Sequence, residues 1–118
     1  EIRVGLYSSR AKRTLRPSLE HAGLLQDFDI VVDGGDVTHN KPHPEGVLMV
    51  LEQLKVPPEN SVMIGDTTAD ILAGKAAGCA LTIGITHGLG TRESLEASEA
   101  DHVVDSLSEV LPIIGVKV

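Results

Sequence analysis

Short apolar runs rich in β-branched residues alternate along this chain with longer segments of helical period, and Gly or Pro stands at most junctions. The runs are almost continuously apolar, which favours strands of a parallel sheet that is covered on both faces. They span residues 4–8, 30–33, Val62–Gly65, Leu81–Ile85 and His102–Val104. The alternation therefore predicts an α/β fold with a mostly parallel sheet between helices.

The segments between these runs predict helices that Pro or a capping residue opens and Gly closes. They span residues 16–22, 44–54 and Thr68–Ala77, with a short helix after Thr91 and a last one opened by Ser106-Leu107-Ser108-Glu109. The apolar stripe of the second helix comprises Val47, Leu48, Val50, Leu51 and Leu54, and in the third helix Ile71, Leu72 and Ala76 are expected to face inward. Gly23 and Gly78 are the expected left-handed stops of the first and third helices.

Composition and charge argue against two classes of function, nucleic acid binding and membrane association. The chain has 118 residues, about one domain or part of one, with 10 Lys and Arg against 17 Asp and Glu, a net charge of −7. With Tyr7 and Phe28 as its aromatic residues, it lacks the basic footprint and stacking rings of a nucleic acid binder. No apolar run or leader predicts membrane association, so we expect a soluble protein. The single cysteine, Cys79, fits a reducing compartment such as the cytoplasm, and the start at Glu1 fits an excerpt of a longer product.

Polar residues follow three of the expected strands, where ligands bind in open α/β sheets. The segments are Tyr7-Ser8-Ser9-Arg10, the stretch from Gly34-Gly35 to Lys41-Pro42, and Gly65-Asp66-Thr67-Thr68-Ala69-Asp70. Hydroxyls, an ammonium group and two carboxylates on one rim are what a phosphoryl-transfer site with a divalent cation needs. Asp66 and Asp70 are four residues apart, so both can face one cleft, and such a pair favours a bound cation or a lysine partner.

Structural alternatives apply to each of these residues. Asp66 could cap a turn and Asp70 could complement a helix dipole, while Lys41 could be a solvated surface group. Serines at a strand end are usually turn formers. The pair His39 and His43 suggests zinc only weakly, because prolines interrupt any helix that would align them. Cys79 is expected to be a small core residue, and the loop His87-Gly88-Leu89-Gly90 could touch substrate or be a simple connection.

Three ordered motifs resemble a known enzyme family. Leu6-Tyr7-Ser8-Ser9, Lys41-Pro42-His43-Pro44 and Met63-Ile64-Gly65-Asp66-Thr67-Thr68-Ala69-Asp70 resemble the second, third and fourth motifs of the haloacid dehalogenase-like hydrolases. The segments Gly74-Lys75-Ala76-Ala77-Gly78 and Ala100-Asp101-His102-Val103-Val104-Asp105-Ser106-Leu107 resemble its phosphoglycolate phosphatase and β-phosphoglucomutase branch. The resemblance covers nearly the whole chain, and it implies a three-layer, Rossmann-like sheet.

The resemblance also implies roles. Ser8 and the backbone amide of Ser9 would bind phosphate oxygens, and Lys41 would neutralise charge on the nucleophile and on the transferring group. Asp66 would ligate Mg²⁺, while Asp70 would support the metal or Lys41. A carboxylate would attack phosphorus to form an aspartyl-phosphate that water then hydrolyses.

One departure from the family pattern is clear. The first family motif, a strand ending in Asp-x-Asp, does not occur in these 118 residues, and the cap domain normally inserted after that strand is missing too; Asp33-Gly34-Gly35-Asp36 has the wrong spacing. The implied function is a Mg²⁺-dependent phosphatase acting on a small phosphorylated metabolite, with the nucleophile supplied from outside this sequence. A phosphosugar mutase of the same fold, or a non-catalytic phosphate-binding or interaction module, are the alternatives.

In the resembling family the first strand lies between the strands that here are residues 4–8 and Val62–Gly65. We therefore expect these two edges not to close on each other, and we expect a missing segment or a second chain to complete the sheet. The chain alone is expected to bind phosphate poorly and to turn nothing over.

Overall fold

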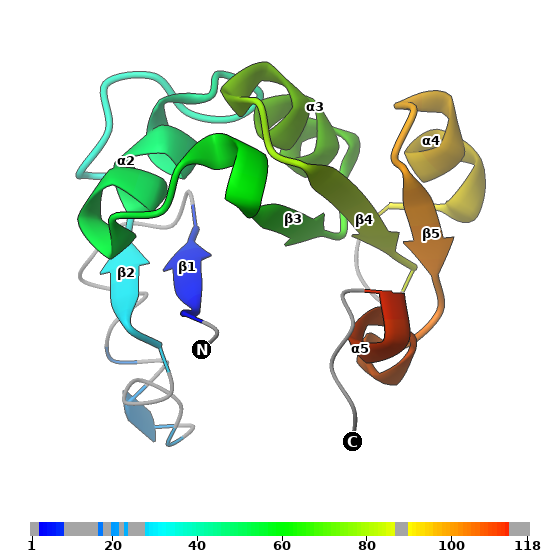
Figure 1. Ribbon diagram of the computed structural model, residues 1–118, viewed down its shortest axis with the longest axis horizontal. Coiled ribbons are helices and arrows are strands. Elements are labelled where there is room, and N and C mark those ends of the chain that lie inside the picture. Colours follow the sequence, from blue (N-terminus) through cyan, green and yellow to red (C-terminus); the bar gives the residue numbers. More distant parts are fainter. Residues whose placement is uncertain are drawn as a thin grey trace.

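In the computed structural model (Figure 1), the structure describes residues 3–8, 17, 20–21, 23, 28–86 and 90–113. Its strands are β1 (Gly5–Tyr7), β2 (Ile30–Val32), β3 (Val62–Gly65), β4 (Leu81–Ile85) and β5 (His102–Val104). Its helices are α2 (Glu45–Leu54), α3 (Thr68–Ala77), α4 (Arg92–Ala97) and α5 (Val110–Ile113), with single 3₁₀ turns at Pro58–Asn60 and Leu107–Glu109. Strand and helix alternate from β2 onward, so the predicted α/β class is confirmed.

Every described strand pair is parallel, but the strands form two sheets. β1 pairs with β2, Gly5 opposite Ile30, while β3, β4 and β5 form a three-stranded sheet in that order. Within the described residues β1 and β3 do not pair, and Figure 1 shows them on either side of an opening. The expectation that these two edges do not close on each other is thus confirmed.

Helices cover both faces of the three-stranded sheet. Met63 of β3 packs against the core cluster of α2 and α3, which consists of Val47, Leu51, Ala73 and Ala77. Ile83 of β4 packs instead with Val104 and with Val110 of α5. Met63 pairs with Thr82 and Ile64 pairs with Ile83, so the two clusters lie on opposite faces, because successive strand residues alternate sides. This arrangement confirms the predicted three-layer organisation.

Three residues expected to face inward do not. Leu48 of α2 and Leu72 of α3 are 40% and 41% exposed, and Ala76 is exposed as well. The buried face of α3 is instead formed by Asp70, Ile71, Ala73, Gly74 and Ala77. Gly74 lets this face lie close to β3 and β4, since a methyl group there would lie 2.7 Å from Met63 and 3.0 Å from Thr82, so apolar character alone does not mark the buried side.

The helix ends largely follow the sequence signals. Thr67 caps α3 in a reciprocal capping box with Asp70, and Gly78 ends it at a φ of 88°. Thr91 caps α4 as expected. At the last helix, Glu109 accepts hydrogen bonds from the amides of Asp105 and Ser106, but the first turn is 3₁₀.

The first expected helix, residues 16–22, lies mostly outside the described residues. Gly23, its expected stop, has a φ of 72°. No helix among the described residues is both long and apolar enough to cross a membrane.

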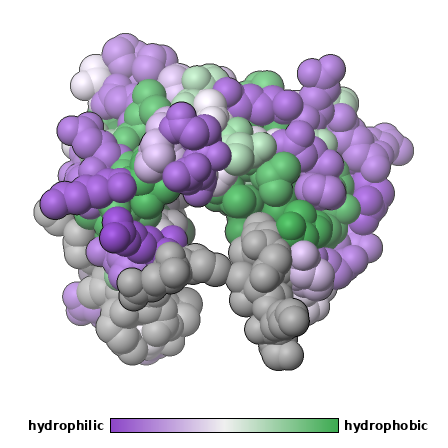
Figure 2. All heavy atoms as spheres, viewed as in Figure 1, coloured by the Kyte–Doolittle hydropathy of each residue, from purple (hydrophilic) through white to green (hydrophobic). Residues whose placement is uncertain are grey.

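One face of the sheet is uncovered beside the opening. Ile64 and Ile83 share a face because they are paired, yet Ile83 is fully buried under α5 while Ile64 is 38% exposed. Val62, two residues before Ile64 on the same face, is 36% exposed. Figure 2 shows a hollow at this place in the molecule. Among the described residues β3 therefore has an unpaired edge and a partly bare apolar face, as a strand inside a larger sheet would have if one neighbouring strand were removed.

Candidate active site

An ion pair joins the two sheets at their carboxyl ends. Nζ of Lys41 lies 2.6 Å from Oδ1 of Asp70, and their side chains are only 16% and 7% exposed. Lys41 lies in the connection from β2 to α2, whereas Asp70 is in the first turn of α3 after β3. The lysine partner expected for the carboxylate pair is therefore present at Asp70.

The second oxygen of Asp70 binds the backbone. Oδ2 accepts hydrogen bonds from the amides of Asp66 and Thr67, at 3.0 and 3.2 Å. Gly65 makes this approach possible, since a methyl group there would lie 2.2 Å from Cβ of Asp70. Burial alone would raise the pKa of the Asp70 carboxyl, but the hydrogen bond and charge of Lys41, with the bonds from Thr67 and Asp66, outweigh it and lower the pKa. Asp70 is thus ionised and fully engaged.

Tyr7 places its ring beside the same ammonium group. Nζ of Lys41 lies 4.9 Å from the ring centroid, within the range of a cation–π contact. The phenol donates a hydrogen bond to Oδ1 of Asn40, the residue before Lys41, at 3.2 Å. Burial raises the pKa of the Tyr7 phenol, so the group stays neutral. Tyr7, Lys41 and Asp70 form a row of contacts from the end of β1 to the end of β3.

Glu45 holds the loop that carries Lys41 in place through hydrogen bonds to its backbone. Its carboxylate accepts hydrogen bonds from the amides of Thr38 and His39, at 2.6 and 3.0 Å. These bonds, first of all that from Thr38, lower the pKa of the Glu45 carboxyl. The amide of His43 closes the turn by donating to the carbonyl of Asn40 at 3.0 Å, and the Lys41–Pro42 peptide bond within it is cis. The loop holds Lys41 at the ends of the strands, where its ammonium group contacts Tyr7 and Asp70.

Ser8 lies at the end of β1, where its amide donates to the carbonyl of Val32 at 3.1 Å. The residue is half-buried and lies next to Tyr7. Ser9, the other expected phosphate-binding residue, falls outside the described residues. The contacts of Tyr7 therefore place Ser8 at the same rim as Lys41.

The segment Asp33-Gly34-Gly35-Asp36 forms a tight turn after β2. Oδ1 of Asp33 accepts the amide of Gly35 at 2.8 Å, and Oδ2 of Asp36 accepts the amide of Asp33 at 2.9 Å. Asp33 is 1% exposed, and its Oδ2 has no hydrogen-bond partner among the described residues. These carboxylates serve the turn, in keeping with their wrong spacing for the first family motif.

Asp66 occupies the first position after β3, and its carboxylate is a hard oxygen donor of the kind that Mg²⁺ prefers. Mg²⁺ is usually held by one or two carboxylates together with substrate oxygens and water. With both oxygens of Asp70 engaged, Asp66 fits a magnesium ligand and Asp70 fits the supporting role toward Lys41. The expected direct contact of Asp70 with the metal would require its present bonds to rearrange.

His39 and His43 come together in spite of the intervening prolines. Their rings stack with centroids 4.7 Å apart, and with Glu45 they form the one group of three potential metal ligands found among the described residues. The amide of Glu45 donates to Nδ1 of His43, while Nδ1 of His39 lies 3.1 Å from the Glu45 carboxylate. Stacked rings do not aim their in-plane lone pairs at one point. We therefore interpret the cluster as a set of contacts that hold the loop in place, not as a metal site.

A comparison with models of protein families identifies the family of this chain. A model of the family described as haloacid dehalogenase-like hydrolase matches residues 1–83. The chain belongs to this family. Its place there explains why the carboxyl ends of β1 and β3 carry the polar residues, since these strands end in the second and fourth motifs noted in the sequence.

The proteins that are similar to this chain include two named enzymes. The phosphoglycolate phosphatase of Salmonella paratyphi A is 37% identical over 114 residues, which are 97% of this chain and 45% of that protein. The phosphoglycolate phosphatase of Escherichia coli K12 is 34% identical over 112 residues, 95% of this chain and 44% of that protein. The chain thus spans about half the length of the curated relatives that it matches.

Solved structures of the family show the same fold. A β-phosphoglucomutase from Clostridium difficile superposes with a TM-score of 0.77 at 36% identity, over 92% of this chain and 45% of that one. A haloacid dehalogenase-family phosphatase from Thermococcus onnurineus superposes with a TM-score of 0.83 at 31% identity, over 98% of this chain and 51% of that one. The predicted family and fold are both confirmed.

Two site neighbours were not predicted from the sequence. Tyr7 was noted only as an aromatic residue at a strand end, and its contact with Lys41 depends on a pairing of distant segments. The amide of Gly90 donates to the carbonyl of Asp66 at 2.8 Å, a contact that no spacing rule reveals. For Gly90, the sequence indicates only a glycine in a loop that follows a strand.

Proposed function

We propose that this chain forms part of a Mg²⁺-dependent phosphatase that hydrolyses the phosphomonoester of a small metabolite through an aspartyl-phosphate. The observation that carries the proposal is the buried Lys41–Asp70 pair beside Asp66 at the carboxyl ends of β1 and β3. A cation held beside strand-end carboxylates is suited to stabilise a transferring phosphoryl group. The phosphoglycolate phosphatases among the relatives make 2-phosphoglycolate the first substrate to test.

In this proposal each residue has a defined task. Ser8 and the amide of Ser9 bind phosphate oxygens, and Lys41 neutralises charge as the P–O bond of the ester breaks. Asp70 holds the ammonium group of Lys41 in place, since its carboxylate lies 2.6 Å from the ammonium nitrogen. Asp66 holds Mg²⁺, which when bound supplies positive charge to the phosphate oxygens.

The nucleophile comes from outside this sequence. A carboxylate attacks phosphorus as the bond to the alcohol oxygen breaks, and the leaving oxygen takes a proton from a general acid that also comes from outside this sequence. Water then gives a proton back to that group and attacks the acyl phosphate, which releases inorganic phosphate and restores the carboxylate. We propose that the strand bearing this carboxylate, from a missing segment or a second chain, lies between β1 and β3. The unpaired facing edges of these strands and the bare face at Ile64 support that placement.

The test uses the full-length gene product. Phosphate release from 2-phosphoglycolate and from p-nitrophenyl phosphate is measured with Mg²⁺ and with a chelator, for the wild type and Lys41→Ala. We expect turnover that needs Mg²⁺ and falls with the substitution. A wild-type protein that binds inorganic phosphate but releases none from any ester would favour the non-catalytic module instead.

A phosphosugar mutase remains the second candidate, because a β-phosphoglucomutase is among the similar structures. In a mutase the phosphoryl group returns to sugar instead of passing to water. Conversion of β-glucose 1-phosphate to glucose 6-phosphate, faster than phosphate release from any ester, would identify this activity.

A further inference from the structure

The backbone of Asp66 is held from both sides. Its amide donates to Oδ2 of Asp70 at 3.0 Å, and its carbonyl accepts the amide of Gly90 at 2.8 Å. A methyl group built on Gly90 would lie 2.3 Å from that carbonyl oxygen, well inside van der Waals contact. Because the oxygen belongs to the backbone, it cannot turn aside as the end of a flexible side chain could. Residue 90 therefore touches Asp66 at a separation that only glycine permits.

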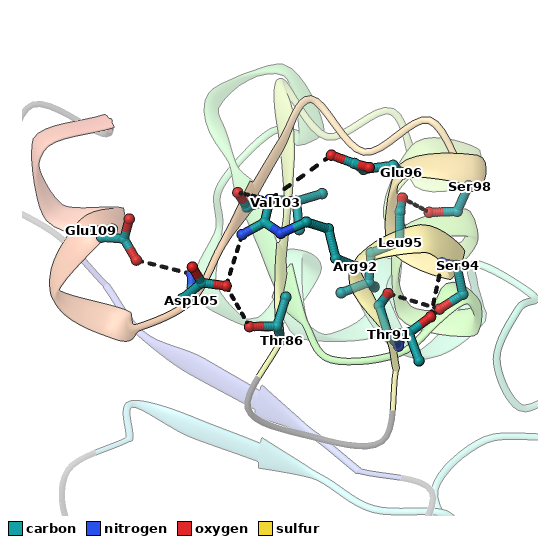
Figure 3. Close-up of polar contacts among 10 residues, drawn as sticks. All are labelled: Thr86, Thr91, Arg92, Ser94, Leu95, Glu96, Ser98, Val103, Asp105 and Glu109. Atoms are coloured by element: carbon teal, nitrogen blue, oxygen red, sulfur yellow. Dashed lines mark hydrogen bonds and ion pairs between the residues drawn. The ribbon is translucent and has the colours of Figure 1, made fainter.

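The residues on both sides of Gly90 are tied to one carboxylate at the end of β5 (Figure 3). Oδ1 of Asp105 accepts a hydrogen bond from the hydroxyl of Thr86 at 2.8 Å and an ion-pair bond from Nη2 of Arg92 at 2.7 Å. Thr86 follows β4 and Arg92 opens α4. Asp105 thus fixes both ends of the connection that carries Gly90.

Further bonds hold this cluster in place. The amide of Thr86 donates to the carbonyl of Val104 at 3.0 Å, and Nη1 of Arg92 lies 3.3 Å from the carbonyl of Val103. The amide of Asp105 donates to Oε2 of Glu109 at 2.9 Å. The bond with Asp105 also raises the pKa of Arg92, so the guanidinium stays charged.

We propose that Gly90, held by the Thr86, Arg92 and Asp105 cluster, is a positioning residue that fixes where Asp66 presents its carboxylate. The inference rests on the proposed function, in which Asp66 holds Mg²⁺. With the amide and the carbonyl of Asp66 both hydrogen-bonded, the backbone position from which its carboxylate extends is fixed. Mg²⁺ demands near-ideal octahedral geometry, so a shift of this backbone should weaken Mg²⁺ binding.

The first experiment uses Gly90→Ala in the full-length gene product. We expect the Mg²⁺ concentration for half-maximal hydrolysis of p-nitrophenyl phosphate to rise by about tenfold or more, as for other residues that orient a metal ligand. kcat should fall, KM should stay within about twofold, and excess Mg²⁺ should restore part of the rate. A lower melting temperature with an unchanged Mg²⁺ midpoint would show a merely structural role and overturn the inference.

The second experiment covers the case in which Gly90→Ala does not fold. Asp105→Asn and Arg92→Gln act at exposed positions, where an ion pair contributes little to stability. Each should raise the Mg²⁺ midpoint in the same direction, by about threefold. Glu96→Gln is the matched control, because it removes a different carboxylate near Arg92, at 3.8 Å, and leaves Asp105 in place. An equal effect of the control would contradict the proposed cluster.

Hydrogen exchange gives a readout that needs neither metal nor turnover. In the metal-free protein, Asp105→Asn should speed exchange of the Gly90 amide at least about fivefold, while Glu96→Gln should not. If the wild type hydrolyses no ester, the proposed function fails, yet this measurement still tests the contact. Unchanged exchange at Gly90 in Asp105→Asn would show that the cluster does not hold the loop against Asp66.

Discussion

Nζ of Lys41 and Oδ1 of Asp70 lie 2.6 Å apart although the residues follow strands of two different sheets. The pair therefore spans the opening between β1 and β3 at the end where the proposed chemistry takes place. The same residue that would stabilise a phosphoryl group also ties the two sheets together. Substitution of Lys41 or Asp70 should therefore change both the turnover and the free energy of unfolding, and the two effects can be measured separately.

Lys41→Ala should lower kcat for phosphate release by at least about tenfold, because a positioned cation stabilises the charge of the transferring group. Lys41→Arg should restore only part of the rate, since the guanidinium is wider and differently hydrated. Steady-state kinetics of the full-length gene product measure both. Lys75→Ala, at an exposed lysine of α3, is the control. Full activity of Lys41→Ala would remove Lys41 from the proposed catalytic site.

Asp66→Asn should raise the Mg²⁺ concentration needed for half-maximal activity by about tenfold or more, because a neutral amide is a weaker ligand for a hard cation. Titration of the rate with Mg²⁺ gives this value. Glu93→Gln, at an exposed carboxylate of α4, should leave it unchanged. An unaltered midpoint in Asp66→Asn would remove Asp66 from the metal site.

The stability contributed by Asp70 should depend on pH. Its folded-state pKa is lowered, so its contribution to the unfolding free energy is fully present above about pH 4 and is lost as the pH falls through the folded-state pKa. Denaturant unfolding of the wild type and Asp70→Asn, from about pH 6 down to about pH 2, should show the difference shrinking on acidification. A constant difference would argue against an ionised, paired carboxylate.

Tyr7→Phe should keep most of the activity, because the ring under the ammonium of Lys41 remains and only the bond to Asn40 is lost. Tyr7→Leu should lower kcat further, by roughly two- to thirtyfold, because the loss of a cation–π contact of about 0.5 to 2 kcal/mol misplaces Lys41. Kinetics of the two variants under the same conditions give the comparison. Equal losses would assign the effect to the hydroxyl group.

The 118-residue chain made alone should release no phosphate and should associate, since it exposes unpaired strand edges and an apolar face at β3. Ile64→Lys should reduce this association, because a charge on the bare face opposes stacking. Light scattering as a function of concentration measures it. Leu48→Lys, at an equally exposed apolar residue of α2, tests whether any added charge would do the same.

Much of the fold could be predicted because its strands are apolar on both faces and end in recognisable polar motifs. Val62–Gly65, Leu81–Ile85 and His102–Val104 have the predicted bounds, while the first two strands are shorter by one or two residues at their ends. The inward faces of the helices were harder to predict. Leu72 is exposed while Ile71 and Gly74 are buried, and hydrophobicity does not encode how closely α3 approaches the sheet at Gly74.

The contacts of the candidate site could likewise be predicted only in part. Lys41 and Asp70 were expected at one rim, because each follows a strand of a parallel sheet. The contacts of Tyr7 and Gly90 depend on how separate loops meet in space, which no local pattern specifies. The proposed task of each residue remains a prediction until the variants are measured.

The opening between β1 and β3 has a practical consequence. In the proposed phosphatase, Ser8, Lys41 and Asp66 lie on one segment and the nucleophile on another, so the enzyme divided between these segments would be a starting point for a two-part sensor. Each piece would be silent alone, and the appearance of phosphatase signal would report that the two pieces, and whatever is fused to them, have met.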